Sequence, residues 1–389
     1  MVGDAGYGMA KGVLIVRGGS LGRNSGLGSA HHNLVDLLNS GAINGWKVAD
    51  ICEYPLEVAK NPFSRLWRRW FKHPKTTKKR ANELSQQGNA QIIHITDQEQ
   101  AHLVPTDSKL PVCVTVHDLF HLFPSTVSLD GEIITVGEHN PGFFRRQDLK
   151  RIKSGLSRAD FLLCDSMFTK SVCEEHFPNV KSLYLPLGIE SSEYYPTEHS
   201  SIDLPNACNL LIVGSNDPRK RMKFIFELLE QLEEEIRNEI HIHYVGDGKS
   251  TKNQPSVDEL IVKFRINNWT SYGSKTSSED LMSLRHNCEA LLFPSASEGF
   301  GYPPLESMAA GMEVLCSNLP SHNELMPENY CLPAENQQIW LDRIIEVHGL
   351  WKARNGEKKP PNEELISHAR NFDNEKFCER MAEFYDSVE

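Results

Sequence analysis

The chain has 389 residues, of which 24% are charged and 39% are apolar, and its formal net charge is -11. This length exceeds what one compact core usually holds, so it predicts two domains of about 150 to 200 residues each. The acidic balance argues against a general nucleic-acid-binding protein, because such proteins are usually basic overall.

The nine cysteines are scattered along the chain and never form a C-x-x-C pair. Several lie inside apolar runs such as VCVTV and FLLCD, which is typical of buried thiols in a reducing compartment. The apolar run Val13–Val16 is too short for the core of a signal peptide, and no run reaches the roughly 18 residues that span a bilayer. We therefore expect a cytoplasmic protein, at most peripheral at the cytoplasmic face of a membrane.

Short apolar runs alternate with amphipathic stretches along both halves of the chain. In the first half the runs are VLIVRG, WKVADIC, QIIHIT, VCVTVHD, DFLLCD and LYLPLG, and in the second half they are NLLIVGS, HIHYVGDG, EALLFPS and EVLCSN. Such runs are typical of strands buried on both faces, with the intervening helices as crossovers. The pattern predicts an α/β fold with two doubly wound, Rossmann-like parallel-sheet domains.

The boundaries of these domains follow from composition. Tyr194–Cys208 is rich in proline, serine and polar residues, which indicates a change of domain, and the stretch from Ile366 onward has apolar residues at helical spacing. We expect a first domain over 1–195, a second over 205–365, and a C-terminal helix over 366–389.

A glycine-rich loop, GGSLGRNSGLGS, follows the first predicted strand. Glycines let backbone N–H groups approach an anion closely, and Ser29 is placed to cap the helix that follows. The loop is therefore either an anion-binding loop or a flexible surface turn. Its glycines are Gly18, Gly19, Gly22, Gly26 and Gly28.

The segment Lys60–Arg80 holds nine Lys or Arg and no acid. Its aromatic residues recur at i, i+4, i+7 and i+8, so one face of a helix would be aromatic and the other cationic. Three interpretations stay open: an interfacial helix on anionic lipid, a core-facing aromatic stripe with a solvated basic face, or a docking site for an anionic acceptor. The aromatic residues are Phe63, Trp67, Trp70 and Phe71.

Two further loops follow predicted strands in the second half. In VGSNDPRKRMKF, Asp217 and Pro218 are expected as the N-cap and first residue of a helix, followed by three cations that oppose its dipole unless an anion binds there. In PSASEGFGYPPLESMAAG, glycines flank an aromatic residue, and a helix beginning at the proline pair is expected to carry Glu306 in its first turn. Both loops are candidates for a ligand site beyond the carboxyl ends of strands.

Taken together, these stretches resemble the retaining glycosyltransferases of the GT-B fold, family 4 (glycosyl transferases group 1), whose E-x7-E motif matches Glu298 to Glu306. The resemblance extends over TVHDLFHLFP, LPLGIESSEYYP, LIVGSNDPRKR, HYVGDGKS, WTSYGS and LPSHNEL, and so covers nearly the whole chain. It implies two facing domains, of which the first binds the acceptor and the second the nucleotide sugar. It also implies that the C-terminal helix crosses back to the first domain.

The resemblance assigns roles to the residues of the E-x7-E loop. Glu306 would accept hydrogen bonds from the ribose hydroxyls, since a carboxylate can take both at once. Glu298 would lie against the donor sugar, and backbone N–H groups around Gly299, Phe300 and Gly301 would contact sugar hydroxyls or phosphate.

Other roles fall on residues outside that loop. Lys220, and less strongly Arg219, would bind the diphosphate, and His117 would lie near the hydroxymethyl group of the donor sugar. Gly26 and Gly28 would contribute the first glycine loop to the donor site.

One position departs from the family pattern. Ser215, which we expect among the donor-binding residues, stands where many family members have an arginine directly after the glycine of VG, and this removes one phosphate contact. Arg219, Arg221 or Arg23 could compensate for it. The departure keeps a noncatalytic nucleotide-sugar-binding protein as an alternative.

The reaction implied is transfer of a hexose from a nucleoside diphosphate to a hydroxyl of a glycan, lipid-linked or small-molecule acceptor, with retained configuration. Front-face departure and attack would need no protein nucleophile, and double displacement through Glu298 is the alternative. No D-x-D triplet occurs, so we expect no metal requirement and no other cofactor. UDP-glucose and GDP-mannose stay equally open as donors, and a GT-B phosphorylase with pyridoxal phosphate is a further alternative.

Overall fold

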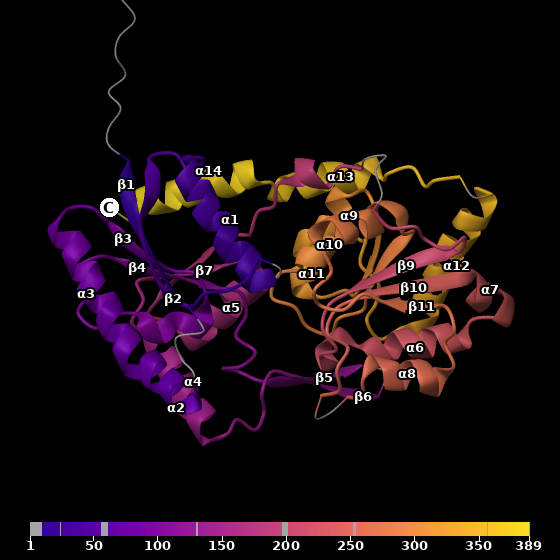
Figure 1. The fold of residues 1–389 in the computed structure, drawn as a ribbon, viewed down its shortest axis with the longest axis horizontal. Helices are drawn as coiled ribbons and strands as arrows, with labels where there is room; N and C mark the ends of the chain where they lie inside the picture. The colour runs from indigo at the N-terminus through magenta and orange to yellow at the C-terminus, as the bar shows by residue number, and fades with distance from the viewer. Residues whose placement is uncertain are drawn as a thin grey trace, which may run out of the picture. The chain divides into compact units, whose positions relative to one another are not determined.

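The computed structural model describes residues 10–23, 25–55, 61–129, 131–196, 201–251, 254–355 and 357–388. Lys60, the first residue of the predicted basic segment, lies outside them. The chain divides into two compact units (Figure 1). The first unit comprises Met1–Phe123, Glu138–Gly188 and Asn374–Glu389, and the second comprises Pro124–Gly137 and Ile189–Asp373.

The first unit is built on a parallel six-stranded sheet, as the apolar runs predict. Its strand order is β2 (Trp46–Tyr54), β1 (Lys11–Gly19), β3 (Ile92–Ile95), β4 (Val112–Val116), β7 (Phe161–Cys164) and β8 (Lys181–Tyr184). Successive side chains of β1 point to opposite faces, so that Val13 and Ile15 belong to one core and Leu14 and Val16 to another. Both faces are therefore covered, as parallel sheets require.

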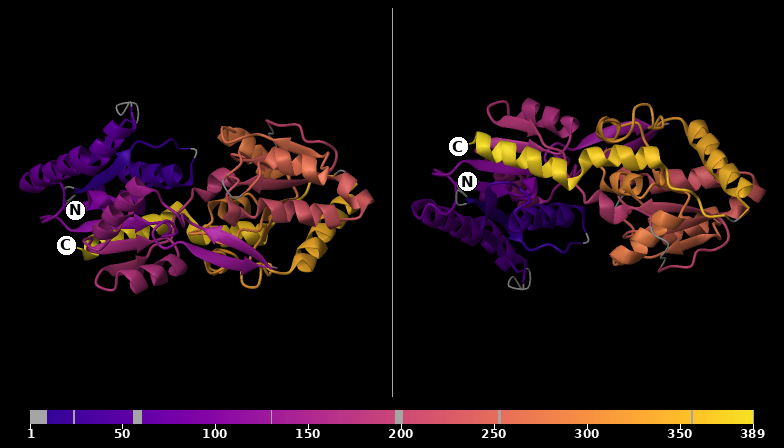
Figure 2. Two further views of the ribbon diagram at one scale, coloured as in Figure 1. Left: turned by 90° about the horizontal axis from the view of Figure 1, so that it is seen from below. Right: turned by 90° about the horizontal axis from the view of Figure 1, so that it is seen from above.

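Helices cover the two faces of this sheet. One face packs against α1 (Gly26–Ser40) and α14 (Asn374–Ser387), which lies along the first unit in Figure 2. The other face packs against α3 (His73–Gln86), η3 (Gln98–Leu103), α4 (Phe143–Leu156) and α5 (Met167–His176). The helix α2 (Pro62–Trp67) and the π-helical turn η2 (Arg68–Lys72) lead into α3.

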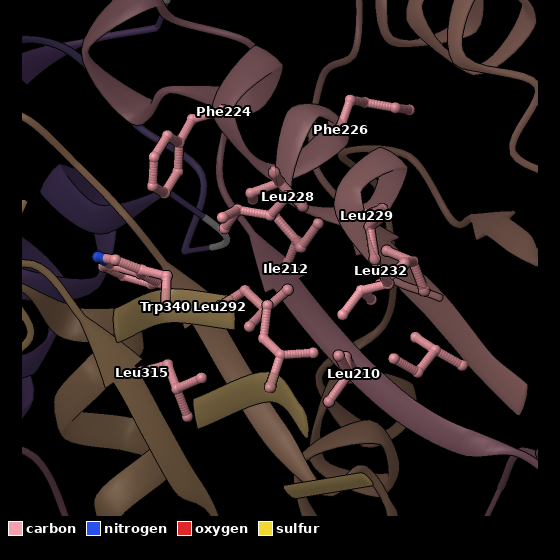
Figure 3. Packing of buried hydrophobic residues seen from close by; sticks show 14 of the residues in the cluster. Leu210, Ile212, Phe224, Phe226, Leu228, Leu229, Leu232, Leu292, Leu315 and Trp340 are labelled. Atoms are coloured by element: carbon pink, nitrogen blue, oxygen red, sulfur yellow. The ribbon is translucent and has the colours of Figure 1, made fainter. Parts of the chain in front are cut away.

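The second unit repeats the architecture with a five-stranded parallel sheet. Its order is β11 (Trp269–Ser271), β10 (Ile240–Val245), β9 (Cys208–Val213), β12 (Ala290–Phe293) and β13 (Glu313–Cys316). On one face Leu210 and Ile212 of β9 pack with Phe224 of α6 (Met222–Gln231) and Trp340 of α12 (Gln337–Ala353), as Figure 3 shows. The other helices are α7 (Glu234–Glu239), α8 (Val257–Phe264), α9 (Ser278–Asn287), α10 (Tyr302–Ala309), α11 (Pro320–Leu325) and α13 (Glu363–Ala369).

An antiparallel hairpin extends the second unit from an earlier part of the chain. It consists of β5 (Ser125–Leu129) and β6 (Glu132–Val136), drawn as a purple pair of strands in Figure 2. β6 contacts the 3-10 turn η5 (Pro218–Lys220), and Glu132 lies 3.8 Å from the Nζ of Lys223. The expected first domain, 1–195, includes this hairpin, whereas its contacts group it with the second unit.

The C-terminal stretch contains a break that its periodicity does not reveal. The expectation of one continuous helix is wrong, because α13 is followed by the 3-10 turn η6 (Arg370–Phe372) and α14 begins only at Asn374. Asp373 at the break is extended, with a ψ of 154°, and its backbone bridges to Ile189. α14 then buries Phe377, Met381 and Tyr385 in the first unit.

The cysteines are largely buried thiols, as the sequence predicts. All nine cysteines are free, and eight of them are buried. Across the described ranges, no helix combines the length and the apolar character needed to cross a bilayer.

Candidate active site

The candidate site lies in the second unit, at the carboxyl ends of two neighbouring strands. From β9 the chain crosses to β10 on one side, whereas β12 pairs with β9 on the other side. The sheet thus has a topological switch point between β9 and β12, which is where ligands of open parallel sheets bind. η5 follows β9, and the loop 294–301 follows β12, so both loops lie at this point.

The turn η5 forms largely as its sequence predicts. Asp217 caps it by accepting a hydrogen bond from the Arg219 backbone N–H at 3.0 Å, and Pro218 is its first residue. The expectation of three cations in the first turn of one helix is wrong, however. Arg221 has a φ of 54°, in the left-handed region, so the chain turns there and α6 begins only at Met222.

Glu298 joins the two loops. Its Oε1 lies 2.5 Å from the Nζ of Lys220, and its Oε2 lies 2.7 Å from the Nη1 of Arg219. Burial alone would raise the pKa of the Glu298 carboxyl, but Arg219 and Lys220 outweigh burial and hold this pKa well below its usual range. The residue is 8% exposed and carries a full negative charge shared between two cations.

Lys220 is positioned by packing as well as by charge. Its Nζ lies 4.4 Å from the centre of the Phe293 ring, and a side chain at Gly214 would contact its methylene carbons. Burial lowers the pKa of the Lys220 ammonium, and the neighbouring charge of Arg219 lowers it further, so that Glu298 offsets the shift only in part. An additional anion here would therefore be stabilised by two incompletely neutralised cations.

Two residues of α11, Ser321 and His322, support the same loop, and the sequence reasoning missed both. The Ser321 hydroxyl donates to the Glu298 backbone carbonyl at 3.0 Å, and the Nδ1 of His322 donates to the Ser317 carbonyl at 2.9 Å. Burial lowers the pKa of His322, which leaves its Nε2 as an acceptor without a partner among the described residues. The family-like stretch LPSHNEL contained both side chains but gave no signal of these contacts.

The backbone conformation of the glycine-aromatic-glycine turn explains why glycine stands at position 301. Gly301 has a φ of 123°, which side chains rarely adopt, and a Cβ there would lie 3.0 Å from Leu325. Phe300 is buried and packs against Phe372, and Gly299 is also buried. These three residues therefore present backbone rather than side chains to any ligand.

Glu306 has partners that the sequence did not indicate. It is bonded to the Nη2 of Arg285, whose side chain is 3% exposed, and its Oε1 accepts from the Tyr194 hydroxyl at 3.3 Å. The expectation of Glu306 in the first turn is wrong, because α10 begins at Tyr302 and Glu306 is its fifth residue. A carboxylate has about four acceptor positions, so two remain for a ligand.

The arginines expected to compensate for Ser215 have different roles. Arg221 is buried and donates to the Ala334 carbonyl at 2.6 Å, and Arg23, in the first unit, pairs with Asp36 at 2.6 Å. Arg219 remains next to Lys220, where it also donates to the Ser297 carbonyl at 2.9 Å. Ser215 itself is exposed.

The first unit holds a second polar centre, around His117 at the end of β4. Its Nδ1 lies 3.0 Å from Asp165, which follows β7, and its Nε2 lies 3.3 Å from the Thr96 carbonyl. Burial alone would lower the pKa of His117, but these two acceptors raise it, since the imidazolium can donate to both. Burial raises the pKa of Asp165 to about 6.

Replacing Asp165 by Asn is expected to lower the pKa of His117, because the burial remains while the carboxylate is lost. Titration of the His117 ring by NMR measures this pKa. Asp160→Asn is the matched control, since Asp160 bonds to the Val112 N–H and not to histidine. An unchanged His117 pKa in Asp165→Asn would contradict the assignment.

The start of α1 in the first unit differs from the expectation. The N-cap of α1 is Ser25 rather than Ser29, because α1 already begins at Gly26. Gly26 and Gly28 thus lie in the first turn of the helix, and a Cβ at Gly28 would clash with the Gly22 carbonyl. The sequence reasoning also missed a buried ion pair at 3.3 Å between Arg17 of β1 and Asp97.

The predicted site residues thus divide between the two units. The second unit brings together Glu298, Lys220 and Arg219, and it carries Glu306 with its own arginine and tyrosine partners. His117, Gly26 and Gly28 belong to the first unit. In the part of the chain that the structure describes, no group of three His, Cys, Asp or Glu side chains could hold a metal ion.

Comparison with known proteins finds similarity over the part of the chain that contains this site. Glycosyl transferases group 1 matches residues 204–359. O-antigen chain mannosyltransferase B of Escherichia coli is 26% identical over 206 residues, which are 51% of this chain and 53% of that protein. The chain thus matches about half the length of this curated relative.

Solved structures agree with the architecture. The sucrose-phosphate synthase of Thermosynechococcus elongatus superposes with a TM-score of 0.69 at 15% identity, over 97% of this chain and 99% of that one. Anabaena HepE in complex with UDP-glucose superposes with a TM-score of 0.63 at 15% identity, over 97% and 99%. The chain therefore has the GT-B fold, and its residues 204–359 match glycosyl transferases group 1.

Proposed function

We propose that the protein transfers a hexose from a nucleoside-diphosphate sugar to a hydroxyl of a glycan, lipid-linked or small-molecule acceptor, with retention of anomeric configuration. The observation that carries the proposal is the carboxylate of Glu298 held between Lys220 and Arg219 at the switch point of the second sheet. It lies within residues 204–359, which match glycosyl transferases group 1. Release of nucleoside diphosphate from a panel of sugar nucleotides, with NMR of the product's anomeric centre, tests both transfer and retention.

Lys220 and Arg219 are placed to stabilise the negative charge of the leaving diphosphate. Breaking the glycosidic bond leaves an additional charge on the departing diphosphate, and preorganised donors stabilise such charge as it develops. Lys220 and Arg219 already lie together in a largely buried site, so little reorganisation is needed when the leaving group forms. Glu306 would hold the ribose through its two remaining acceptor positions.

The environment of Glu298 favours front-face transfer over double displacement. A carboxylate nucleophile must give up its ion pairs in order to attack, and Glu298 is bonded to two cations that hold its pKa well below the usual range. Such stabilisation makes it a weak nucleophile. In front-face transfer the leaving phosphate oxygen accepts the proton of the acceptor hydroxyl, and Glu298 orients Lys220 and Arg219.

The donor is proposed to carry glucose or mannose. The name of the Escherichia coli relative favours a mannosyl donor, whereas the HepE complex contains UDP-glucose. His117 and the glycines of α1 are proposed to contact the donor sugar, as the family resemblance implies. A thermal-shift panel with GDP-mannose, UDP-glucose and ADP-glucose separates the candidates, since a ligand that binds only the folded state raises Tm.

Turnover is expected to be unchanged after EDTA treatment. The charge of the diphosphate is assigned to Lys220 and Arg219, so that no divalent cation is needed for it. The measurement compares initial rates before and after chelation, followed by addition of Mg²⁺ or Mn²⁺. Loss of activity that either ion restores would contradict metal independence.

A noncatalytic nucleotide-sugar-binding protein is the second candidate, and the observation that favours it is the exposed Ser215 in place of a phosphate-binding arginine. It predicts sugar-nucleotide binding without hydrolysis or transfer in the presence of any acceptor. The release assay above distinguishes it from a transferase.

A further inference from the structure

The first unit contains an open pocket of about 400 Å³ between α3 and α4, none of whose residues belongs to the site proposed above. Its floor comes from the residues 102–106 at the end of η3 and beyond. This volume is in the range of small-ligand sites. The charged residues that line it are Lys75, Lys78, Lys150, Arg151 and Arg158.

The charge of this pocket is unbalanced. Five cations and no acid line it, although the chain as a whole has a net charge of -11. Lys75 and Lys150 are exposed and form no ion pair with any described residue, and Lys78 reaches only Thr106 at 3.3 Å and the exposed Asp107 at 3.9 Å. Cations held this close repel one another, so an anion bound among them would be stabilised.

The pocket is also lined by a buried polar side chain, that of His102. His102 is 8% exposed, and its Nδ1 has no hydrogen-bond partner among the described residues. A buried polar atom without a partner costs free energy, and a ligand hydroxyl or a water molecule could bond to it. Trp70 provides an apolar wall, fixed by its Nε1, which donates to Asp148 at 2.9 Å.

Exposed aromatic side chains adjoin two residues that line this basic pocket, Trp70 and Arg151. The interpretation of Lys60–Arg80 as a core-facing aromatic stripe is wrong, since three of its four aromatic side chains are exposed and Trp70 is only partly buried. Arg151 links the pocket to these rings, because it lies 5.0 Å from the centre of Trp70 and 5.5 Å from that of Phe71. The exposed rings are Phe63 (78%), Trp67 (57%), Phe71 (41%), Phe143 (63%) and Phe144 (60%).

We propose that the pocket between α3 and α4 binds a phosphate-bearing group, carried by a membrane lipid or by a soluble phosphate ester. Five cations provide the charge, and the volume accommodates a phosphorylated headgroup or sugar. The neighbouring exposed rings would contact the interfacial region of a bilayer when the phosphate belongs to a lipid.

The test compares two double variants of the full-length chain. Lys75→Ala/Lys150→Ala removes two pocket cations, and Lys79→Ala/Arg146→Ala removes two exposed cations that do not line the pocket from the same two helices. The probes are inorganic pyrophosphate, by calorimetry, and phosphatidylcholine vesicles with or without phosphatidic acid, by co-sedimentation. Equal Tm values confirm that both variants are folded.

The pocket variant is expected to bind at least one probe about tenfold more weakly than wild type, while the control stays within about twofold. Loss of binding to phosphatidic acid vesicles alone identifies a lipid source, and loss of pyrophosphate binding identifies a soluble ester. Neither double variant should change pyrophosphate binding near Lys220. A failure of the proposed donor site can therefore be told apart from a failure of this pocket. Absence of binding by wild type, or equal binding by the two variants, would overturn the proposal.

Discussion

Glu298→Gln is expected to lower kcat by about 10²- to 10³-fold and to leave measurable turnover with retention. The amide keeps the shape of the side chain but cannot neutralise Lys220 and Arg219, which lie 2.5 and 2.7 Å from the carboxylate oxygens. Under front-face transfer the variant loses orientation of the cations rather than a nucleophile. Single-turnover rates and the anomeric configuration of the product measure the outcome.

The matched control is Glu313→Gln, which breaks another partly buried ion pair, with Arg343 at 2.8 Å, at the start of β13. It is expected to leave kcat unchanged. A complete loss of turnover in Glu298→Gln, together with a trapped glycosyl-enzyme in the wild type, would instead identify Glu298 as a nucleophile.

The same substitution has a pH-dependent effect on stability. Because the folded-state pKa of Glu298 is depressed, its contribution to the free energy of unfolding is fully present above the unfolded pKa, about 4.3, and is lost as pH falls below it. Glu298→Gln is therefore expected to cost about 3 kcal/mol at pH 7 and less at pH 3. Urea unfolding at both pH values measures the difference, and an equal cost at both would contradict the ion-pair assignment.

Glu306→Ala is expected to weaken binding of the nucleoside diphosphate by at least about 30-fold, because hydrogen bonds to a charged acceptor contribute about 1.5 to 3 kcal/mol each. It also leaves the buried Arg285 without its carboxylate. The free energy of unfolding should fall by about 3 kcal/mol. Calorimetric titration well below Tm separates the loss of affinity from the loss of stability.

Tyr194→Phe is the control for this prediction. It removes one hydrogen bond to Glu306, at 3.3 Å, and keeps both the carboxylate and the Arg285 pair. Its effect on nucleotide affinity should be less than about fivefold. If Tyr194→Phe weakens binding as strongly as Glu306→Ala does, Glu306 serves to position its neighbours and does not itself bind the ribose.

The parallel sheets were predictable because strands buried on both faces have apolar runs that single-sequence periodicity detects. The break at Asp373 was not predictable, since η6 interrupts a stretch whose apolar spacing stays helical. The antiparallel β5–β6 hairpin was missed because its exposed residues gave no apolar run comparable to those of the buried strands. Of the two predicted N-cap residues, Asp217 was correct. The other was wrong, because Ser25 rather than Ser29 caps α1.

For the site, the sequence predicted which residue types lie in which loops, but it did not predict the contacts between loops that are distant in sequence. The approach of Lys220 to Glu298 depends on β9 and β12 being neighbours, and strand order is not written in either loop. Arg285 gave no signal at all, because a single arginine in a helix is usually solvated. Asp165 follows the apolar run FLLC and could have been found as a charged residue at the end of a buried strand.

The central claim is that the second unit binds the nucleotide of an activated sugar through Glu306 and the cations beside Glu298. Calorimetric titration of wild type and Glu306→Ala with GDP-mannose, UDP-glucose and ADP-glucose tests it most directly. We predict that at least one of these donors binds wild type with a Kd below about 1 mM and binds Glu306→Ala far more weakly. No binding of any of the three to wild type at millimolar concentration, or equal binding by both proteins, would contradict it.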